Sequence, residues 1–215
     1  MKLEATIKDD GDYVRCVSQD GNKRRTFTVQ LNDFIEAIAS INSDNQVEYF
    51  PRNGKLPETL YDFQLGRNCT GFTCHAVFRF PSEKQLITFC NETFYVLMPT
   101  LIFDMRVYNG KLEQGISRVF AENKDGKLCS CPMSNVYADG HICWGSVRVP
   151  SVKNLKELED ICKLFIHAPG NSDLTGFFRS TKYGSLGNLL KILETAEEFP
   201  EDAYTVFENK IESLF

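Results

Sequence analysis

Short segments rich in apolar and aromatic residues recur through the middle of the 215-residue chain, separated by residues that favour turns. The separators include Asn109-Gly110 and Asn123-Lys124-Asp125-Gly126, and their residue types accept the backbone angles of tight turns. Asn-Gly between two apolar runs is a strong hairpin signal. The pattern therefore predicts mostly antiparallel strands, at Gln46–Pro51, Thr59–Leu65, Cys74–Phe80, Gln85–Cys90, Thr100–Tyr108 and Ile116–Ala121.

The first 45 residues form a separate pattern. Three segments, Lys2–Lys8, Tyr13–Ser18 and Arg25–Gln30, alternate in the manner of strands, with turn residues between them. A helix follows, because Asn32 or Asp33 can cap it and the apolar residues from Phe34 to Ile41 recur at helical spacing. We expect a small N-terminal extension of strands and one helix at residues 1–45.

Helices are predicted after residue 150. Apolar residues from Leu155 to Phe165 recur with a helical period, and a second helix is expected from Ser185 or Leu186 to Phe199. A third helical segment is expected at Tyr204–Leu214. The predicted fold class is α+β, with an antiparallel meander and C-terminal helices in a core at residues 46–215.

Composition narrows the classes of partner. The net charge is −5 and the pI is near 5.3, which argues against nucleic-acid binding because that function depends on clustered Lys and Arg. The start of the chain lacks the apolar run of a signal peptide, and no apolar stretch reaches the ~20 residues that span a bilayer. We expect a cytoplasmic protein that binds neither nucleic acid nor membrane.

Eight cysteines occur in the chain. Without an export signal, they are expected to be thiols rather than disulfides. Most lie among apolar residues, as Cys16 and Cys162 do, and are expected to be small buried core residues. Cys143 has different neighbours.

The segment from Ser134 to Cys143 combines a thiol with an amide. Asn135 precedes Cys143 by eight positions, and Ala138-Asp139-Gly140 between them is typical of a tight turn. Such a turn would fold Asn135 back toward Cys143. A cysteine thiolate is a nucleophile in acyl transfer, and an amide N–H can stabilise the oxyanion that forms. Cys143 and Asn135 are therefore the candidate catalytic residues, and Asp139 is expected mainly to form the turn.

The order of a strand meander, an Asn-containing loop, Asp-Gly, a cysteine and then helices resembles the ubiquitin-conjugating (E2, UBC-like) fold. In that family the loop reads His-Pro-Asn, then Asp-Gly, then the catalytic cysteine with the same Asn-to-Cys spacing. Over roughly residues 50–175 the chain resembles prokaryotic E2 family D, the group of PRTRC system protein B. The matching segments are Leu56-Pro57, Met98-Pro99-Thr100-Leu101-Ile102-Phe103, Ser134-Asn135-Val136-Tyr137, Cys143-Trp144-Gly145-Ser146 and Phe165-Ile166-His167.

The resemblance implies a bacterial conjugation protein. Cys143 would accept a ubiquitin-like protein as a thioester from an E1-like adenylating enzyme and would pass it to an amine or hydroxyl of a target protein. Asn135 would support the oxyanion. The step requires no cofactor, metal or nucleotide, because the E1-like partner uses ATP beforehand.

One departure from the E2 pattern affects the loop. Met133-Ser134 replaces His-Pro, which weakens the assignment of the E2 asparagine's oxyanion role to Asn135. This departure motivates an alternative in which the protein is a noncatalytic E2-like platform that binds the ubiquitin-like protein. Auxiliary candidates are His167, as an imidazole near the incoming nucleophile or as a residue bonding the helix-terminal carbonyls, and Ser146, as an alternative acyl acceptor or a structural hydroxyl.

A zinc site is the rival interpretation of the sulfur-rich region. Cys129 and Cys131 precede His141 and Cys143, and four such ligands can hold zinc in a tetrahedron. The spacing differs from the usual C-x-x-C knuckle, so a zinc-stabilised structural protein is the less favoured alternative. A pair of thiols at a strand end is preferred, and no metal ligand is predicted.

Overall fold

The computed structural model describes residues 2–7, 13–20, 23–35, 56–66, 71–176, 178 and 181–215. The chain divides into two compact units, Met1–Leu56 and Pro57–Phe215. The predicted boundary between residues 45 and 46, and the strand predicted at Gln46–Pro51, lie outside the described residues. Mostly antiparallel sheets with few helices make up the fold, in agreement with the predicted α+β class. No helix in the described ranges is long and apolar enough to cross a membrane.

The N-terminal unit contains a three-stranded antiparallel sheet, as predicted. Residues 31–35 are helical, and Leu31 packs with Val14 and Cys16 in a small apolar cluster. The remainder of the predicted helix lies outside the described residues. The strands are β1 (Lys2–Ile7), β2 (Tyr13–Asp20) and β3 (Lys23–Gln30).

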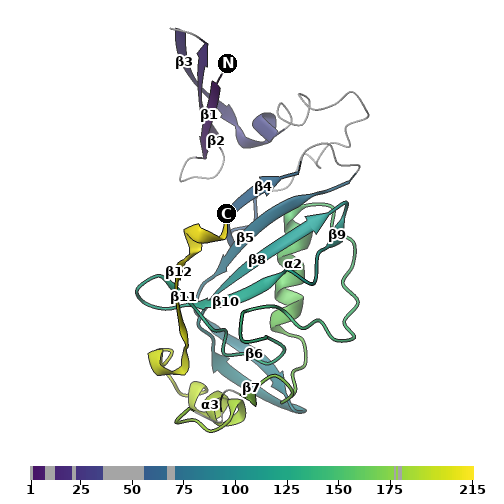
Figure 1. Ribbon diagram of the computed structural model, residues 1–215, viewed down its shortest axis with the longest axis vertical. Coiled ribbons are helices and arrows are strands. Elements are labelled where there is room, and N and C mark those ends of the chain that lie inside the picture. The colour runs from purple at the N-terminus through teal and green to yellow at the C-terminus, as the bar shows by residue number, and fades with distance from the viewer. Residues whose placement is uncertain are drawn as a thin grey trace. The chain divides into compact units, whose positions relative to one another are not determined.

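The second unit is built on a seven-stranded sheet in the order β12-β11-β10-β8-β5-β4, with β9 paired to β8 (Figure 1). Successive side chains of the central strands β5 and β8 point to opposite faces of the sheet, and most of them are apolar and buried. Both faces of the sheet are therefore covered by other parts of the chain. The strands are β4 (Leu60–Leu65), β5 (Cys74–Phe80), β8 (Thr100–Tyr108), β9 (Lys111–Leu112), β10 (Arg118–Glu122), β11 (Lys127–Cys129) and β12 (Val206–Lys210).

Helix α2 (Leu155–Ile166) covers one face of this sheet and confirms the predicted helix. The Asn154 side chain caps its start by accepting a hydrogen bond from the backbone N–H of Glu157 at 2.9 Å. Phe165 packs edge-on against Phe103 of β8, with ring centroids 6.0 Å apart. The helix therefore ends beside the sheet core.

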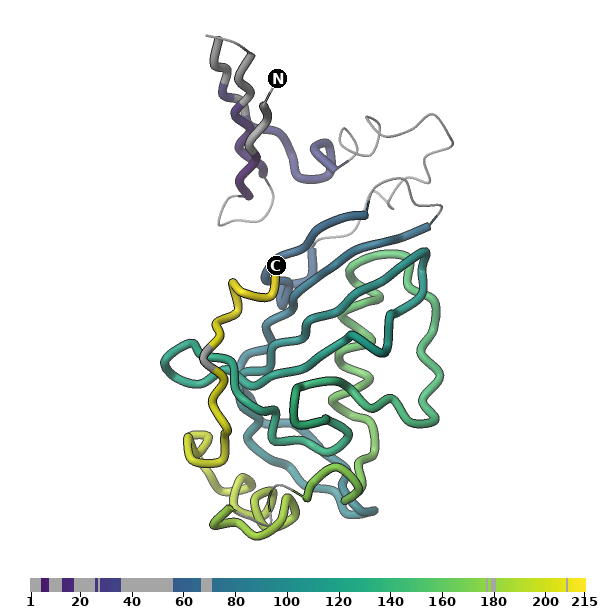
Figure 2. Tube along the Cα trace, viewed as in Figure 1, coloured from purple at the N-terminus to yellow at the C-terminus, as the bar shows by residue number. Residues whose placement is uncertain are grey.

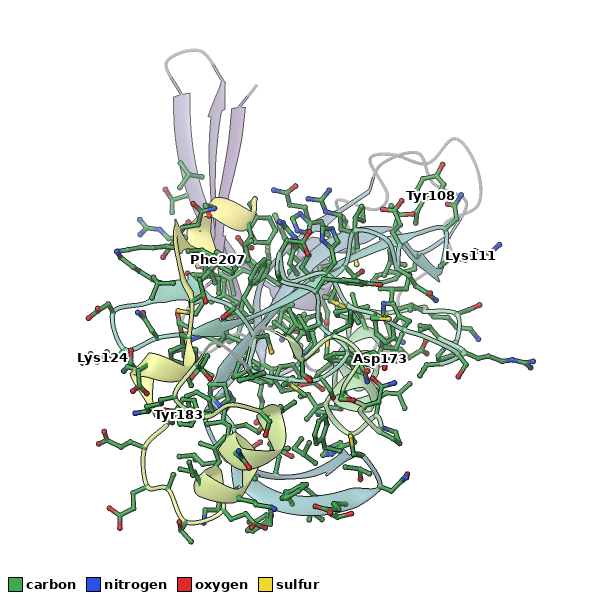
Figure 3. All side chains as sticks on the ribbon, turned by 60° about the horizontal axis from the view of Figure 1, so that its bottom comes forward. Tyr108, Lys111, Lys124, Asp173, Tyr183 and Phe207 are labelled. Atoms are coloured by element: carbon green, nitrogen blue, oxygen red, sulfur yellow. The ribbon has the colours of Figure 1, made fainter. Side chains whose placement is uncertain are left out.

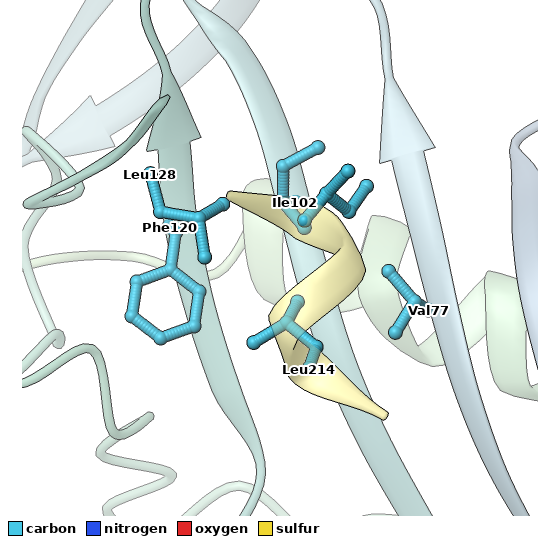
Figure 4. Packing of buried hydrophobic residues seen from close by; sticks show 6 residues of the cluster. Val77, Ile102, Phe120, Leu128 and Leu214 are labelled. Atoms are coloured by element: carbon cyan, nitrogen blue, oxygen red, sulfur yellow. The ribbon is translucent and has the colours of Figure 1, made fainter. Parts of the chain in front are cut away.

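The C-terminal segment covers the opposite face. Leu214, in the 3₁₀ helix η3 (Ile211–Leu214), packs with Val77, Ile102 and Phe120 (Figure 4). The helix predicted at Tyr204–Leu214 is wrong, because this segment forms β12 and then η3. Pairing of β12 with β11 satisfies its backbone groups, and this long-range contact outweighs local helical preference.

A two-stranded hairpin, β6 (Lys84–Phe89) and β7 (Glu92–Leu97), lies apart from the main sheet order. Helix α3 (Leu186–Leu193) contacts β7 and begins at the Ser185 cap, as predicted. The predicted end at Phe199 is wrong, because the helix stops at Leu193 and a 3₁₀ turn, η2 (Glu201–Ala203), follows. Strand β7 is absent from the sequence prediction.

A buried charge cluster lies on the sheet face that η3 partly covers. Asp104 is 0% exposed and accepts hydrogen bonds from Arg118, at 3.0 and 2.5 Å, and lies 2.6 Å from His75 Nε2. Burial alone raises the pKa of Asp104, but the bonds from His75 and Arg118 outweigh burial and hold that pKa below its ordinary value. The carboxylate is thus kept charged inside the fold.

Candidate active site

The segment from Asn135 to Cys143 is a narrow hairpin. The backbone N–H of Cys143 donates to the carbonyl oxygen of Asn135 at 2.8 Å, and the N–H of Tyr137 donates to the carbonyl of His141 at 2.9 Å. The N–H of Gly140 closes the turn on the carbonyl of Tyr137 at 2.9 Å. The predicted turn is confirmed, and it brings Asn135 opposite Cys143. Figure 2 traces this segment in green between β11 and α2.

The inner face of the hairpin is apolar and anchored. Val136 and Ile142 pair across it, and both are buried. The N–H of Ile142 donates to the carbonyl of Ser117 at 3.1 Å, and the N–H of Val119 in β10 donates to the carbonyl of Gly140 at 2.8 Å. Because side chains alternate along an extended strand, burial of this inner pair leaves the flanking side chains on the outer face.

Cys143 is half-buried and lines a cavity of about 290 Å³. Residues after it form one wall, and the loop after α2 forms another. An open volume beside a thiol gives room for an extended peptide or an acceptor side chain. The other residues that line the cavity are Asn135, Trp144, Gly145, Ser146, Val147, Phe165, Ala168, Pro169, Asn171, Asp173 and Leu174.

Most other described cysteines are buried. Burial raises the pKa of Cys74 to about 12 and that of Cys129 to about 11. Burial likewise raises the pKa of Cys131 and Cys162 above the ordinary thiol value. Such thiols are poor nucleophiles at neutral pH because the thiolate is the reactive form.

Tyr137 is a site residue that the sequence analysis did not select. Its exposed ring lies on the outer face of the hairpin, and the neighbouring Cys143 side chain raises the pKa of Tyr137. The phenol therefore stays protonated and can donate to the sulfur. The Asn-x-Tyr spacing is the signal that could have identified it, because residues two apart share a face of a strand.

Asn135 adopts a left-handed backbone conformation, with φ 61°. Its side-chain amide donates to the carbonyl oxygen of Pro169 at 3.2 Å. The contact ties the hairpin to the loop after α2. Asn135 also lines the cavity, so the amide lies at the wall that an acyl group on Cys143 would face.

Asp139 and His141 form a pair at the tip of the hairpin. One carboxylate oxygen accepts the His141 backbone N–H at 3.2 Å, and the other lies 2.9 Å from His141 Nδ1. The bond from His141 lowers the pKa of Asp139. Asp139 therefore has the turn-forming contact that the sequence predicts, together with a side-chain partner.

Ser146 lies in a turn that follows Cys143. The N–H of Val147 donates to the carbonyl of Trp144 at 2.9 Å, and Gly145 between them has φ 51°. Ser146 is exposed and lines the cavity. The Trp144 ring packs edge-on against Phe165 at 5.7 Å, which anchors the residue after Cys143 to α2.

His167 is the C-cap residue of α2. Its backbone N–H donates to the carbonyl of Lys163 at 3.2 Å, and its ring Nδ1 lies 3.3 Å from the carbonyl oxygen of Leu86 in β6. The next two residues, Ala168 and Pro169, line the cavity instead. The side chain thus reaches a strand carbonyl beside the helix end.

Asp173, which is labelled in Figure 3, is one of the residues that line the cavity. Asn171 donates its side-chain amide to Asp173 at 2.9 Å and accepts the Asp173 backbone N–H at 3.0 Å. These bonds hold the loop after α2 in a compact turn. No local sequence pattern indicates either residue, because they follow Cys143 by 28 and 30 positions and the fold alone brings them near.

The family of the chain follows from comparison with known proteins. The family model named prokaryotic E2 family D matches residues 68–204, which is more than half of the chain. The chain belongs to prokaryotic E2 family D. The match spans the sheet strands from β5 to β11, the hairpin, Cys143 and α2 of this family D protein, and it indicates an E2-like role in a bacterial ubiquitin-like pathway. No curated protein and no solved structure matched the chain.

The rival zinc interpretation is not supported in this family D protein. Within the described parts of the chain, no three His, Cys, Asp or Glu side chains are grouped so that they could hold a metal ion. Cys129 and Cys131 are buried, whereas Cys143 is half-buried at the cavity. His141 bonds Asp139 instead. The four sulfur and imidazole ligands therefore do not form the proposed zinc set.

Proposed function

We propose that this family D protein is the E2-like carrier of a bacterial ubiquitin-like pathway. Cys143 accepts a ubiquitin-like protein from an E1-like adenylating enzyme as a thioester and passes it to a target protein. We also propose that the core has a UBC-like fold and that the protein is related to PRTRC system protein B.

The access of Cys143 is the observation that carries this proposal. Its half-buried thiol opens on a cavity of about 290 Å³. The hairpin hydrogen bonds give the thiol a defined position opposite Asn135. An acyl carrier needs a nucleophile with room for the acyl group, and Cys is the strongest nucleophile among uncharged side chains.

Asn135 is proposed to stabilise the oxyanion that forms at the acyl carbonyl. An amide side chain has two N–H donors, and one contact to Pro169 leaves donor capacity for a second acceptor. Hydrogen bonds aimed at a developing oxyanion lower the barrier of acyl transfer. The lining of the cavity by Asn135 supports this role.

The cavity favours an amine acceptor. Asp173 contributes a carboxylate to the wall of the cavity that Cys143 also lines. A carboxylate attracts the ammonium group of a lysine side chain into the cavity, and the amine attacks once the ammonium has lost a proton to solvent. We therefore propose that a target lysine enters along the loop after α2.

Reconstitution tests this function. The purified chain is incubated with the E1-like enzyme, the ubiquitin-like protein and ATP, and the products are separated with and without dithiothreitol. The proposal predicts an adduct that dithiothreitol removes and that is absent in Cys143→Ala. Cys90→Ala is the matched control, because Cys90 is an exposed thiol in the turn between β6 and β7.

The noncatalytic platform predicts a different result. In that case Cys143→Ala binds the ubiquitin-like protein as the parent does and retains its biological function. An adduct that persists in Cys143→Ala and disappears in Cys90→Ala contradicts the choice of Cys143.

A further inference from the structure

The Asp139–His141 pair lies one residue away from the reactive thiol. Asp139 contacts both the backbone N–H of His141, at 3.2 Å, and the ring Nδ1, at 2.9 Å. Two contacts from one carboxylate fix both the turn and the imidazole ring. A carboxylate beside Nδ1 favours the tautomer with hydrogen on Nδ1, which leaves the lone pair on Nε2.

The hairpin places His141 on the same side as Cys143. Ile142, between them, is buried on the inner face, whereas the His141 side chain is 36% exposed. Residues two apart on an extended strand share a face, with Cα atoms about 6.6 Å apart. The imidazole therefore lies on the same face of the strand as Cys143, beside the cavity that Cys143 lines rather than among its lining residues.

The elements next to the His141 imidazole carry other titratable or charged side chains. Tyr137 on the opposite strand has its pKa raised by the neighbouring Cys143 side chain, so its hydroxyl stays neutral. Arg118 of β10 pairs its backbone with His141 but directs its guanidinium to Asp104. Among the described contacts, Asp139 is thus the charged group that bonds the imidazole directly.

We propose that His141, positioned by Asp139, accepts the proton of the nucleophile that attacks the Cys143 thioester. This role rests on the proposed carrier function. It adds a residue that the E2-like assignment does not supply.

The acceptor in this step is an amine or a hydroxyl, written here as X–H. A new bond forms between X and the acyl carbon while the bond from that carbon to Cys143 Sγ breaks. The proton of X–H passes to Nε2 of His141, and Cys143 leaves as a thiolate. The imidazolium then passes its proton to the thiolate, which restores both the neutral imidazole and the thiol.

A chemical assay isolates this step from the upstream partners. The 215-residue chain carrying Cys90→Ser is acylated with a Gly-Gly peptide thioester of mercaptoethanesulfonate, and peptide mapping locates the acyl group. Transfer to free lysine is then followed by intact mass between about pH 6 and pH 9, where imidazoles and amines change charge. The variants are His141→Ala, Asp139→Asn and the control Asp125→Asn, an exposed residue in the turn between β10 and β11.

The proposal predicts that His141→Ala slows transfer to lysine by about tenfold or more and that added imidazole restores part of the rate. Asp139→Asn keeps an oxygen for the turn and slows transfer less. Asp125→Asn transfers at the parental rate. Hydroxylamine, which attacks thioesters without a base, discharges parent and His141→Ala at equal rates.

Two results overturn the role of His141. One is transfer to lysine from His141→Ala at the parental rate with an unchanged pH profile. The other is slower discharge by hydroxylamine as well, without rescue by imidazole, because that pattern indicates lost access to the thioester. A Cys143 that forms no thioester contradicts the carrier function itself, so the two failures are distinguishable.

Discussion

Cys143 and Asn135 face each other across a hairpin, joined by a hydrogen bond of 2.8 Å from the backbone N–H of Cys143 to the carbonyl of Asn135. The bond belongs to the backbone, so it survives substitution of either side chain. The chemistry of the two side chains can therefore be tested with the hairpin intact.

Gly140→Ala is expected to destabilise the hairpin. Gly140 has φ +89°, and an added Cβ would lie 2.6 Å from Cε1 of the buried Phe120 ring. Gly126→Ala is the matched control, because Gly126 has φ +73° and open space around it. Urea unfolding should show that Gly140→Ala loses about 1–3 kcal/mol more than Gly126→Ala. Equal losses would mean that backbone strain alone explains the effect and that Phe120 yields.

Asn135 can be tested for two separable roles. Asn135→Ala removes the hydrogen bond to Pro169. It also places alanine, which has a Cβ but no polar side-chain group, at the left-handed φ of 61°. Asn135→Gly removes the same bond without the backbone strain, so it should be more stable by about 1 kcal/mol. If the amide supports the oxyanion, both variants slow transfer from Cys143 to lysine equally despite their different stabilities. Parental transfer by Asn135→Gly would restrict Asn135 to bracing the loop.

Asp104 is expected to make stability depend on pH. Its pKa in the folded chain is lowered, so its charge contributes stability above the unfolded pKa of about 3.9 and loses that contribution as the pH falls through the lower folded value. Asp104→Asn should cost about 3 kcal/mol at pH 7, since it leaves Arg118 without its carboxylate partner. Denaturant unfolding should find a smaller difference between parent and variant in strong acid. A constant difference across the acid range would contradict the assigned charge.

The local signals in the sequence predicted the central strands well. The predicted bounds of β5 and β8 equal those observed, because dense apolar runs bounded by turn residues leave few alternatives. Strand β7 was missed because its hairpin turn is Cys90-Asn91, with φ 50° and 66° and no glycine. A turn with those angles normally requires Gly or Asn, and Cys90 gives no such signal.

Long-range pairing limited the prediction elsewhere. The segment Val206–Lys210 is a strand because Lys127 pairs with Lys210 and Cys129 with Val206, contacts that no local pattern reveals. The candidate site shows the same difference between local and long-range contacts. The approach of Asn135 to Cys143 could be predicted because the two residues are close in sequence, whereas Asp173 reaches the cavity only through the path of α2.

The most direct measurement of the central claim is mass spectrometry of the conjugated protein. The chain is loaded by the E1-like enzyme with ATP and the ubiquitin-like protein, digested without reducing agent, and the modified residue is identified. The account predicts the C-terminal remnant of the ubiquitin-like protein on the Cys143 peptide, as a thioester that hydroxylamine removes. A remnant on Cys90, or on no cysteine while the target is still modified, would contradict it.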